Sequence, residues 1–172
     1  LDTLVDRILA SVRDDRPELT IRRARFDVRA ATSTALKELG PLLRRHKLRT
    51  PRAAAPLWVR GDRRKTAEVL GGLLHNATKY TPPGTAISVS IAKAGDRASV
   101  RVADDGAGIP KEDRERIFHP FVRGNGVSAI PGSGIGLYAC RRIVEAQGGR
   151  LWCEDVDGGG AAFVFTIPLA TP

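Results

Sequence analysis

The stretch Asp104-Asp105-Gly106-Ala107-Gly108-Ile109-Pro110 decides the expected fold, together with Gly132-Ser133-Gly134-Ile135-Gly136-Leu137 further along the chain. Glycines accept positive φ and let backbone N–H groups come close to a ligand. Several such groups at the start of a helix form an anion site. The carboxylate of Asp104, expected at a strand end, can fix a hydrogen-bonding ring. The two clusters indicate a nucleotide site with a base end, a phosphate end and a movable cover.

Each glycine cluster is a weak signal by itself. The first is equally compatible with a β-turn that begins at Asp104, and the second with a flexible loop before a helix. The second also lacks the Lys-Ser/Thr of a P-loop and the third glycine of the dinucleotide fingerprint. If Asp104 does meet a base, adenine is favoured, because a carboxylate accepts from its exocyclic amine whereas guanine presents an acceptor there.

Periodicity predicts the elements around these clusters. Apolar residues at helical spacing predict helices, with Asp27 and Asp62 as N-caps and Gly148-Gly149 as a C-terminal stop. Alternating apolar residues predict two hairpins. The expected helices are Leu1–Val12, Val28–Leu39 up to a break at Gly40-Pro41, Arg63–Tyr80 and Ser133–Gln147; strands are expected within Arg16–Arg25, at Lys47–Pro51, Leu57–Arg60, Ile87–Ile91, Ala98–Val102, Leu151–Cys153 and Ala162–Ile167.

Long helices with hairpins between them predict an α+β two-layer sandwich. The 172 residues suit one domain, and the chain has no methionine, so we expect a fragment of a longer protein. No run of about 18 apolar residues could span a membrane. A net charge of +9 fits an anionic ligand or partner, but 5% aromatic content argues against a base-stacking nucleic-acid surface. Cys140 and Cys153 form no ligand pattern, which indicates a reducing, cytosolic setting.

The helix before the first hairpin adds three polar side chains on one face. Asn76, Lys79 and Tyr80 are spaced i, i+3 and i+4. Asn76 can give a neutral oxygen to Mg²⁺, which prefers oxygen ligands and phosphates. Lys79 offers a point charge to phosphate. For this helix alone, a solvated amphipathic face explains the pattern as well.

Taken in order, these motifs resemble those of bacterial two-component sensor histidine kinases. Asn76–Thr81 resembles the N box, Asp104–Ile109 the G1 box, Ile117–Phe121 the F box and Gly132–Leu137 the G2 box. The ordered set is specific although each motif is weak, and it covers roughly Phe26 to Leu169. The resemblance implies the Bergerat (GHKL, HATPase_c) fold, which is a mixed sheet backed by about three helices with an ATP lid.

The resemblance also implies roles, residue by residue. Asp104 would bind the adenine amine, Asn76 would hold Mg²⁺ and Lys79 would meet phosphate. Tyr80 would lie against the nucleoside, Phe118 and Phe121 would dock the lid on the body, and Arg123 could reach the terminal phosphate. The base pocket would be walled by Gly106, Gly108 and Ile109, and the phosphates would meet Gly132, Ser133, Gly134, Ile135, Gly136 and Leu137.

Three positions depart from the family pattern. Gly72 stands where many members have a second asparagine, His119 where a glutamate is frequent, and Ala161 where a threonine is common. The usual phosphoacceptor motif, His-Glu-x-x-Thr-Pro, is absent.

The expected function is therefore that of an ATP-binding catalytic domain. It would present the γ-phosphate to a histidine on a dimerisation domain outside this chain, for onward transfer to a response regulator. We expect residues 1–16 to be the tail of a dimerisation helix, 17–25 a linker and 26–172 the catalytic domain, with a lid at about 110–131. We expect a cytoplasmic location, with no nucleic-acid or direct membrane contact; whether the parent protein is anchored in the inner membrane stays open. The alternatives are another GHKL protein, such as an anti-sigma-factor serine kinase, or a degenerate interaction module.

Overall fold

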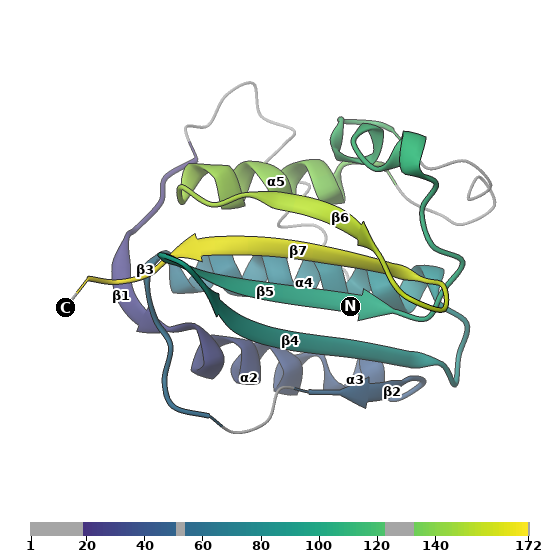
Figure 1. Ribbon diagram of the computed structural model, residues 1–172, viewed down its shortest axis with the longest axis horizontal. Coiled ribbons are helices and arrows are strands. Elements are labelled where there is room, and N and C mark those ends of the chain that lie inside the picture. Colours follow the sequence, from purple (N-terminus) through teal and green to yellow (C-terminus); the bar gives the residue numbers. More distant parts are fainter. Residues whose placement is uncertain (1–18, 51–53, 123–132, 172) are drawn as a thin grey trace.

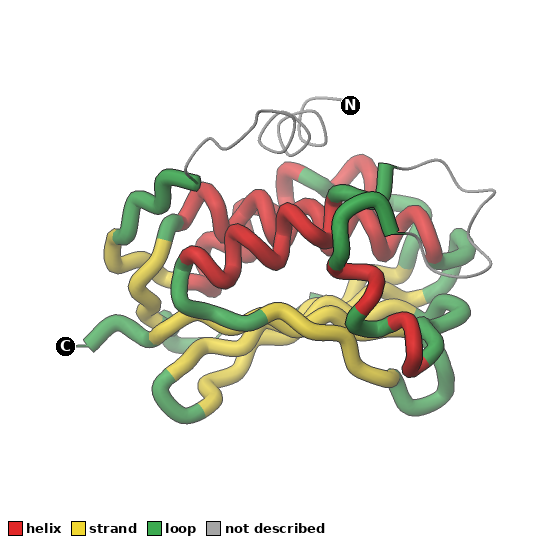
Figure 2. The backbone as a smooth tube through the Cα atoms, turned by 90° about the horizontal axis from the view of Figure 1, so that it is seen from above, coloured by secondary structure: helices red, strands yellow, loops and turns green. Residues whose placement is uncertain are grey.

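The computed structural model describes residues 19–50, 54–122 and 133–171. Within these residues the chain forms two layers, a β-sheet and a layer of helices that covers one face of it (Figure 2). This confirms the predicted α+β sandwich. The expected helix Leu1–Val12 lies outside the described residues.

The main sheet is mixed and has five strands in the order β2-β4-β5-β7-β6 (Figure 1). The β2–β4 pair is parallel, and the other three pairs are antiparallel. A separate antiparallel ribbon pairs β1 with β3. The strands are β1 (Ala24–Asp27), β2 (Lys47–Arg49), β3 (Trp58–Gly61), β4 (Ala86–Ala94), β5 (Arg97–Asp104), β6 (Leu151–Asp155) and β7 (Ala161–Pro168).

Three helices of eleven residues or more form the other layer. They are α2 (Val28–Glu38), α4 (Arg63–Tyr80) and α5 (Gly136–Ala146); α3 (Gly40–Leu43) and the 3₁₀ turns η1 (Lys111–Asp113) and η2 (Arg116–Phe118) are shorter. Both predicted caps are confirmed. Asp27 accepts from the N–H of Arg29, and Asp62 accepts from the N–H groups of Arg64 and Lys65. These bonds satisfy donors that the first helical turn leaves without partners.

The core lies between the two layers and follows the predicted periodicities. Alternate residues of β5 are buried against the helices, namely Ala98, Val100 and Val102. Helix α4 crosses the middle of the sheet and contacts both α2 and α5. Its predicted apolar face is buried, at Val69, Leu70, Leu73, Leu74 and Ala77.

The predicted start of α5 is wrong by three residues. The helix begins at Gly136 and not at Ser133. Gly134 has φ of 72°, which is left-handed and cannot belong to a right-handed helix. The predicted stop is confirmed, since Gly148 has φ of 80° and the N–H groups of Gly148 and Gly149 return to carbonyls of the last turn.

The register of the central strands fixes which residues meet at one end of the sheet. Asp104 ends β5 and pairs with Ile87 of β4 and Ala161 of β7. The end of α4 and the start of α5 lie at the same end (right-hand side of Figure 1). None of the helices in the described part of the chain has the length and apolar character needed to cross a bilayer.

Candidate nucleotide-binding site

Asp104 is a buried carboxylate at the end of the central strand. Its residue is only 7% exposed, and its Oδ1 accepts a 2.9 Å hydrogen bond from the N–H of Gly106. Burial raises the pKa of this carboxyl above its ordinary value, and the Gly106 N–H opposes that rise by favouring the charged form. The site therefore holds a desolvated acceptor, and a desolvated acceptor discriminates strongly between a donor and an acceptor on a ligand.

Gly106 allows the chain to pass directly beside this carboxylate. A Cβ at this position would lie 2.7 Å from Asp104 Oδ1, 3.1 Å from the carbonyl oxygen of Tyr80 and 3.3 Å from Thr81 Oγ1. No side chain fits there. The predicted close approach at Gly106 is thus present, and it joins the end of β5 to the end of α4.

Thr81 brings a second buried polar group to this place, one that the sequence analysis did not select. The residue is 4% exposed, and its hydroxyl lies near enough to Asp104 to favour the charged form and so lower the pKa of that carboxyl, but it makes no hydrogen bond of ordinary geometry. A buried hydroxyl with so weak a partner is costly. Together with Asp104, it offers a donor and an acceptor whose hydrogen bonding a ligand can complete.

Gly160 is a further site residue that sequence reasoning missed, because it was read only as part of a hairpin turn. It has φ of 97°, and a Cβ there would overlap the carbonyl oxygen of Asp104. Gly108, with φ of 76°, packs in turn against the Gly160 carbonyl, 2.9 Å from where a Cβ would stand. The signal available in the sequence was the run Gly158-Gly159-Gly160, which is longer than a hairpin needs.

The polar face of α4 is partly exposed, as predicted. Asn76, Lys79 and Tyr80 are all half-buried, and Lys79 Nζ lies 5.1 Å from the centre of the Tyr80 ring. The neighbouring His75 has a lowered pKa, chiefly because of burial and then because of the Lys79 charge. Lys79 is the cation of this face, and burial together with the Lys79 charge favours the neutral form of His75.

The second glycine cluster meets the start of α5. The carbonyl of Gly134 accepts a 3.1 Å hydrogen bond from the N–H of Phe121. Ile135 is buried, and no side chain caps the N-terminus of α5. The N–H groups of the first turn are therefore open to an anion. Ser133 and Gly136 are exposed and Leu137 packs on the core, whereas Gly132 lies outside the described residues.

The segment before the second cluster is anchored at Phe118. This ring is 3% exposed, meets Phe163 edge to face at 6.1 Å and has the Arg141 guanidinium 5.2 Å from its centre. Arg114 pairs with Asp155 of β6 and donates from Nε to the carbonyl of Ile109 at 3.1 Å. The first half of the predicted lid is thus tied to α5 and to the β6–β7 hairpin.

The predicted packing of Phe121 on the body is wrong. Phe121 is 74% exposed and has φ of 64°, so the chain turns there and directs the ring into solvent. Its contribution to nucleotide binding stays a prediction. Arg123 and the rest of the predicted lid, up to residue 132, fall outside the described part of the chain.

The residues present fit an adenine nucleotide. A buried carboxylate, a buried hydroxyl without a hydrogen bond of ordinary geometry and glycines that admit no side chain surround one place. A helix start without a side-chain cap lies at the same end of the sheet. For the metal, residues 19–50, 54–122 and 133–171 contain no cluster of three His, Cys, Asp or Glu side chains that could hold an ion alone. A neutral oxygen from Asn76 fits Mg²⁺ only as one ligand beside phosphate oxygens.

An α+β sandwich with such a site defines a class of ATP-binding domain. The family described as histidine kinase-, DNA gyrase B-, and HSP90-like ATPase (HATPase_c) matches residues 61–171, and the chain belongs to this family. The resemblance drawn from the ordered motifs is therefore confirmed.

Relatives and solved structures narrow the class to histidine kinases. The chain is 36% identical over 173 residues to the adaptive-response sensory kinase SasA of Synechococcus sp. strain JA-3-3Ab, covering 98% of this chain and 46% of that protein. It therefore spans just under half the length of such relatives. Full-length ShkA in complex with AMPPNP matches with a TM-score of 0.77 and 26% identity, over 99% of this chain and 36% of ShkA. Histidine kinase ThkA in complex with response regulator TrrA matches with a TM-score of 0.76 and 25% identity, over 98% and 47%.

Proposed function

We propose that this chain binds ATP with Mg²⁺ and presents the γ-phosphate to a histidine on a dimerisation domain. The observation that carries the proposal is the buried Asp104 carboxylate at the end of β5, beside Gly106 and the buried hydroxyl of Thr81. Similarity to ShkA, whose structure holds AMPPNP, supports a nucleotide as the ligand.

The chain's own residues would divide the task by position. Asp104 accepts from the adenine amine, and Gly106, Gly108 and Ile109 wall the base. Lys79 and the first turn of α5 attract the phosphates, since both present positive charge. Tyr80 lies along the nucleoside, and Asn76 offers one oxygen to Mg²⁺. The metal, when bound, neutralises phosphate charge; positioning and charge stabilisation are most of what phosphoryl transfer requires.

The domain limits and the location belong to the same proposal. We infer that residues 1–16 continue a dimerisation helix, that 17–25 link it to the catalytic domain and that 110–131 form the lid. The phosphoryl group would pass from the histidine to a response regulator, as similarity to ThkA in its complex with TrrA supports. A domain with this task acts in the cytoplasm.

The first experiment is a calorimetric and thermal-shift titration of the chain with ATP, ADP and GTP, with and without Mg²⁺. We expect ATP and ADP to bind and GTP not to bind. At a hundred times its dissociation constant, a ligand stabilises the folded chain by about 2.7 kcal/mol. Asp104→Asn should abolish most of this gain, because the amide is a poorer acceptor and presents a donor to the adenine amine.

Asp96→Asn is the matched control. Asp96 lies in the β4–β5 turn with its side chain 89% exposed, so the same chemical change there should leave nucleotide binding intact. Absence of binding by every nucleotide would overturn the proposal and favour a degenerate interaction module. Phosphate transfer to a separately produced dimerisation domain, but not to a serine-bearing partner, would distinguish a histidine kinase from an anti-sigma-factor serine kinase.

A further inference from the structure

The β1–β3 ribbon carries two arginines directly opposite each other. Arg25 pairs in register with Arg60, and both side chains are on the outer face, since Phe26 and Val59 fill the buried face. Like charges directly opposite in an antiparallel pair are destabilising. Among the residues that the structure describes, no carboxylate forms an ion pair with either arginine. The ribbon therefore keeps two exposed cations together at a cost.

The Arg25 guanidinium is held in place by an aromatic ring. Its central carbon lies 4.5 Å from the centre of the Trp58 ring, and Trp58 is itself 42% exposed. Stacking uses the flat face of a guanidinium and leaves its N–H groups, which lie in the plane, free to donate. The stack thus prepares Arg25 for a bidentate hydrogen bond to a carboxylate.

A shallow cleft of about 230 Å³ lies beside this pair. It is lined by Arg23, Ala24, Arg25, Arg60, Ala170 and Thr171, so three of its six residues are arginines and none is acidic. Arg23 is itself fixed, through a 2.8 Å hydrogen bond from Nη2 to the carbonyl of Ala146 at the end of α5. The one carboxylate on the outer face of the ribbon, Asp27, already accepts from the N–H groups of Arg29 and Leu57.

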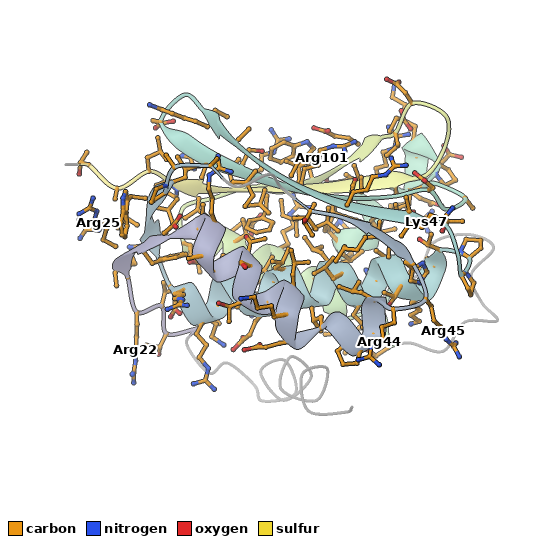
Figure 3. The ribbon with its side chains drawn as sticks, turned by 90° about the horizontal axis from the view of Figure 1, so that it is seen from below. Arg22, Arg25, Arg44, Arg45, Lys47 and Arg101 are labelled. Carbon is orange, nitrogen blue, oxygen red and sulfur yellow. The ribbon has the colours of Figure 1, made fainter. Side chains whose placement is uncertain are left out.

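We infer that the outer face of the β1–β3 ribbon is a docking surface for an acidic segment of another protein or domain. Arg25 and Arg60 would each bind a carboxylate, and this would relieve the repulsion between them. The surface lies at the opposite end of the molecule from Arg44, Arg45 and Lys47 (Figure 3), and β5 runs away from it toward Asp104 (Figure 1). The docking surface therefore lies away from the proposed nucleotide site.

The test uses the 172-residue chain and a fluorescently labelled peptide of six glutamates, with a peptide of six glutamines as the control ligand. We expect the glutamate peptide alone to bind at 100 mM NaCl, and Arg25→Gln or Arg60→Gln to weaken binding about tenfold, the size expected for one charge-assisted hydrogen bond. In a Trp152→Phe background, Trp58 is the sole tryptophan. Its emission should change when the glutamate peptide binds.

Arg44→Gln is the matched control, because it removes the same charge from an exposed site at the other end. If Arg44→Gln weakens binding as much as Arg60→Gln, binding follows net charge and the proposal is overturned. Failure of the glutamate peptide to bind overturns it as well. A single-stranded 20-mer DNA and phosphatidylserine vesicles are tested in the same way. If the binding of either depends on Arg25 and Arg60 more strongly than peptide binding does, the proposal is overturned and the surface belongs to that class of partner.

Discussion

Gly159 and Gly160 are adjacent and have nearly the same φ, 105° and 97°, but an added Cβ would meet another part of the chain only at Gly160. Alanine at either position meets the same backbone strain, of order 1–3 kcal/mol. At Gly160 it also collides with the Asp104 carbonyl. We predict that Gly160→Ala is more destabilising than Gly159→Ala by roughly 1–3 kcal/mol, the usual size of an overpacking penalty. Of the two variants, only Gly160→Ala should weaken ATP binding.

Urea unfolding and calorimetry of both variants check this prediction. Equal losses of stability would mean that the strand end moves freely to accommodate the new methyl group. Unchanged ATP affinity in Gly160→Ala would mean that the position of the Asp104 backbone is unimportant for the base.

Thr81 provides a prediction with opposite signs for the free and the bound protein. Its hydroxyl is buried and makes no hydrogen bond of ordinary geometry, only a weak interaction with Asp104, so Thr81→Val should raise the stability of the nucleotide-free chain, by up to about 1–3 kcal/mol. The same change removes a group that the ligand would satisfy, so ATP affinity should fall.

Thr78→Val is the control for Thr81→Val, because the Thr78 hydroxyl already donates to the carbonyl of His75. Thermal unfolding with and without ATP separates the two effects. A loss of stability in the free Thr81→Val protein would contradict the prediction and indicate that the hydroxyl is satisfied in the folded state.

His75 gives the pH dependence a definite sign. Burial and Lys79 lower its pKa in the folded protein from the ordinary 6.5, so the unfolded chain binds this proton more readily. The contribution of neutral His75 to the free energy of unfolding is therefore complete above about pH 6.5, and it decreases as the pH falls below that value. We predict that His75→Gln reduces the loss of unfolding free energy between pH 7 and 5, as measured by urea unfolding. The same change at the exposed His119 should not alter that loss. An identical pH profile in His75→Gln and the parent chain would refute this.

At the scale of elements, Gln147 joins the end of α5 to the start of α4. It is 2% exposed; its Oε1 accepts from the N–H of Asp62 at 2.7 Å and from the Thr66 hydroxyl at 3.3 Å, and its Nε2 donates to the carbonyl of Ile143. Gln147→Leu would leave a buried N–H unpaired. We predict a loss of roughly 1–3 kcal/mol in the free energy of unfolding.

Urea unfolding of Gln147→Leu measures that loss, and Glu145→Gln on the same helix is the control. The ion pair of Glu145 with Arg141 is exposed, and such pairs contribute little. A Gln147→Leu variant as stable as the control would show that the two helices hold together by apolar packing alone.

The elements that the sequence predicted well are those whose pattern is complete within a short stretch. Helix α4 has its cap at Asp62 and an unbroken apolar face, and the β4–β5 hairpin has two alternating strands around one turn. The start of α5 and the exposure of Phe121 depend instead on positive φ at Gly134 and Phe121, where two distant segments meet. The role of Thr81 appears only once the end of α4 meets the end of β5, and that of Gly160 only once β5 and β7 are paired, so no local pattern could predict them.

At the scale of the whole molecule, two electrostatic effects oppose each other. The net charge of +9 disfavours the compact state by self-repulsion, whereas exposed ion pairs such as Arg141–Glu115 stabilise it slightly. Salt screens both. We predict that self-repulsion is the larger effect, so that raising NaCl from 10 to about 200 mM, where screening is strong, increases the midpoint of thermal unfolding. A decrease would show that the ion pairs outweigh the net charge.

The pairing of β5 with β7 has a consequence for the folding pathway. The site needs Asp104 of β5 in register with Ala161 of β7, which brings Gly160 against Asp104. These two strands are separated by the whole segment that contains the predicted lid and α5. Contacts between such distant parts of a chain form late, after the entropy of closing the loop has been overcome. An intermediate that lacks this pairing has no place for a nucleotide. ATP should therefore slow the unfolding of the finished domain and do little to accelerate its folding, so the ligand lengthens the lifetime of the native state without guiding the chain toward it.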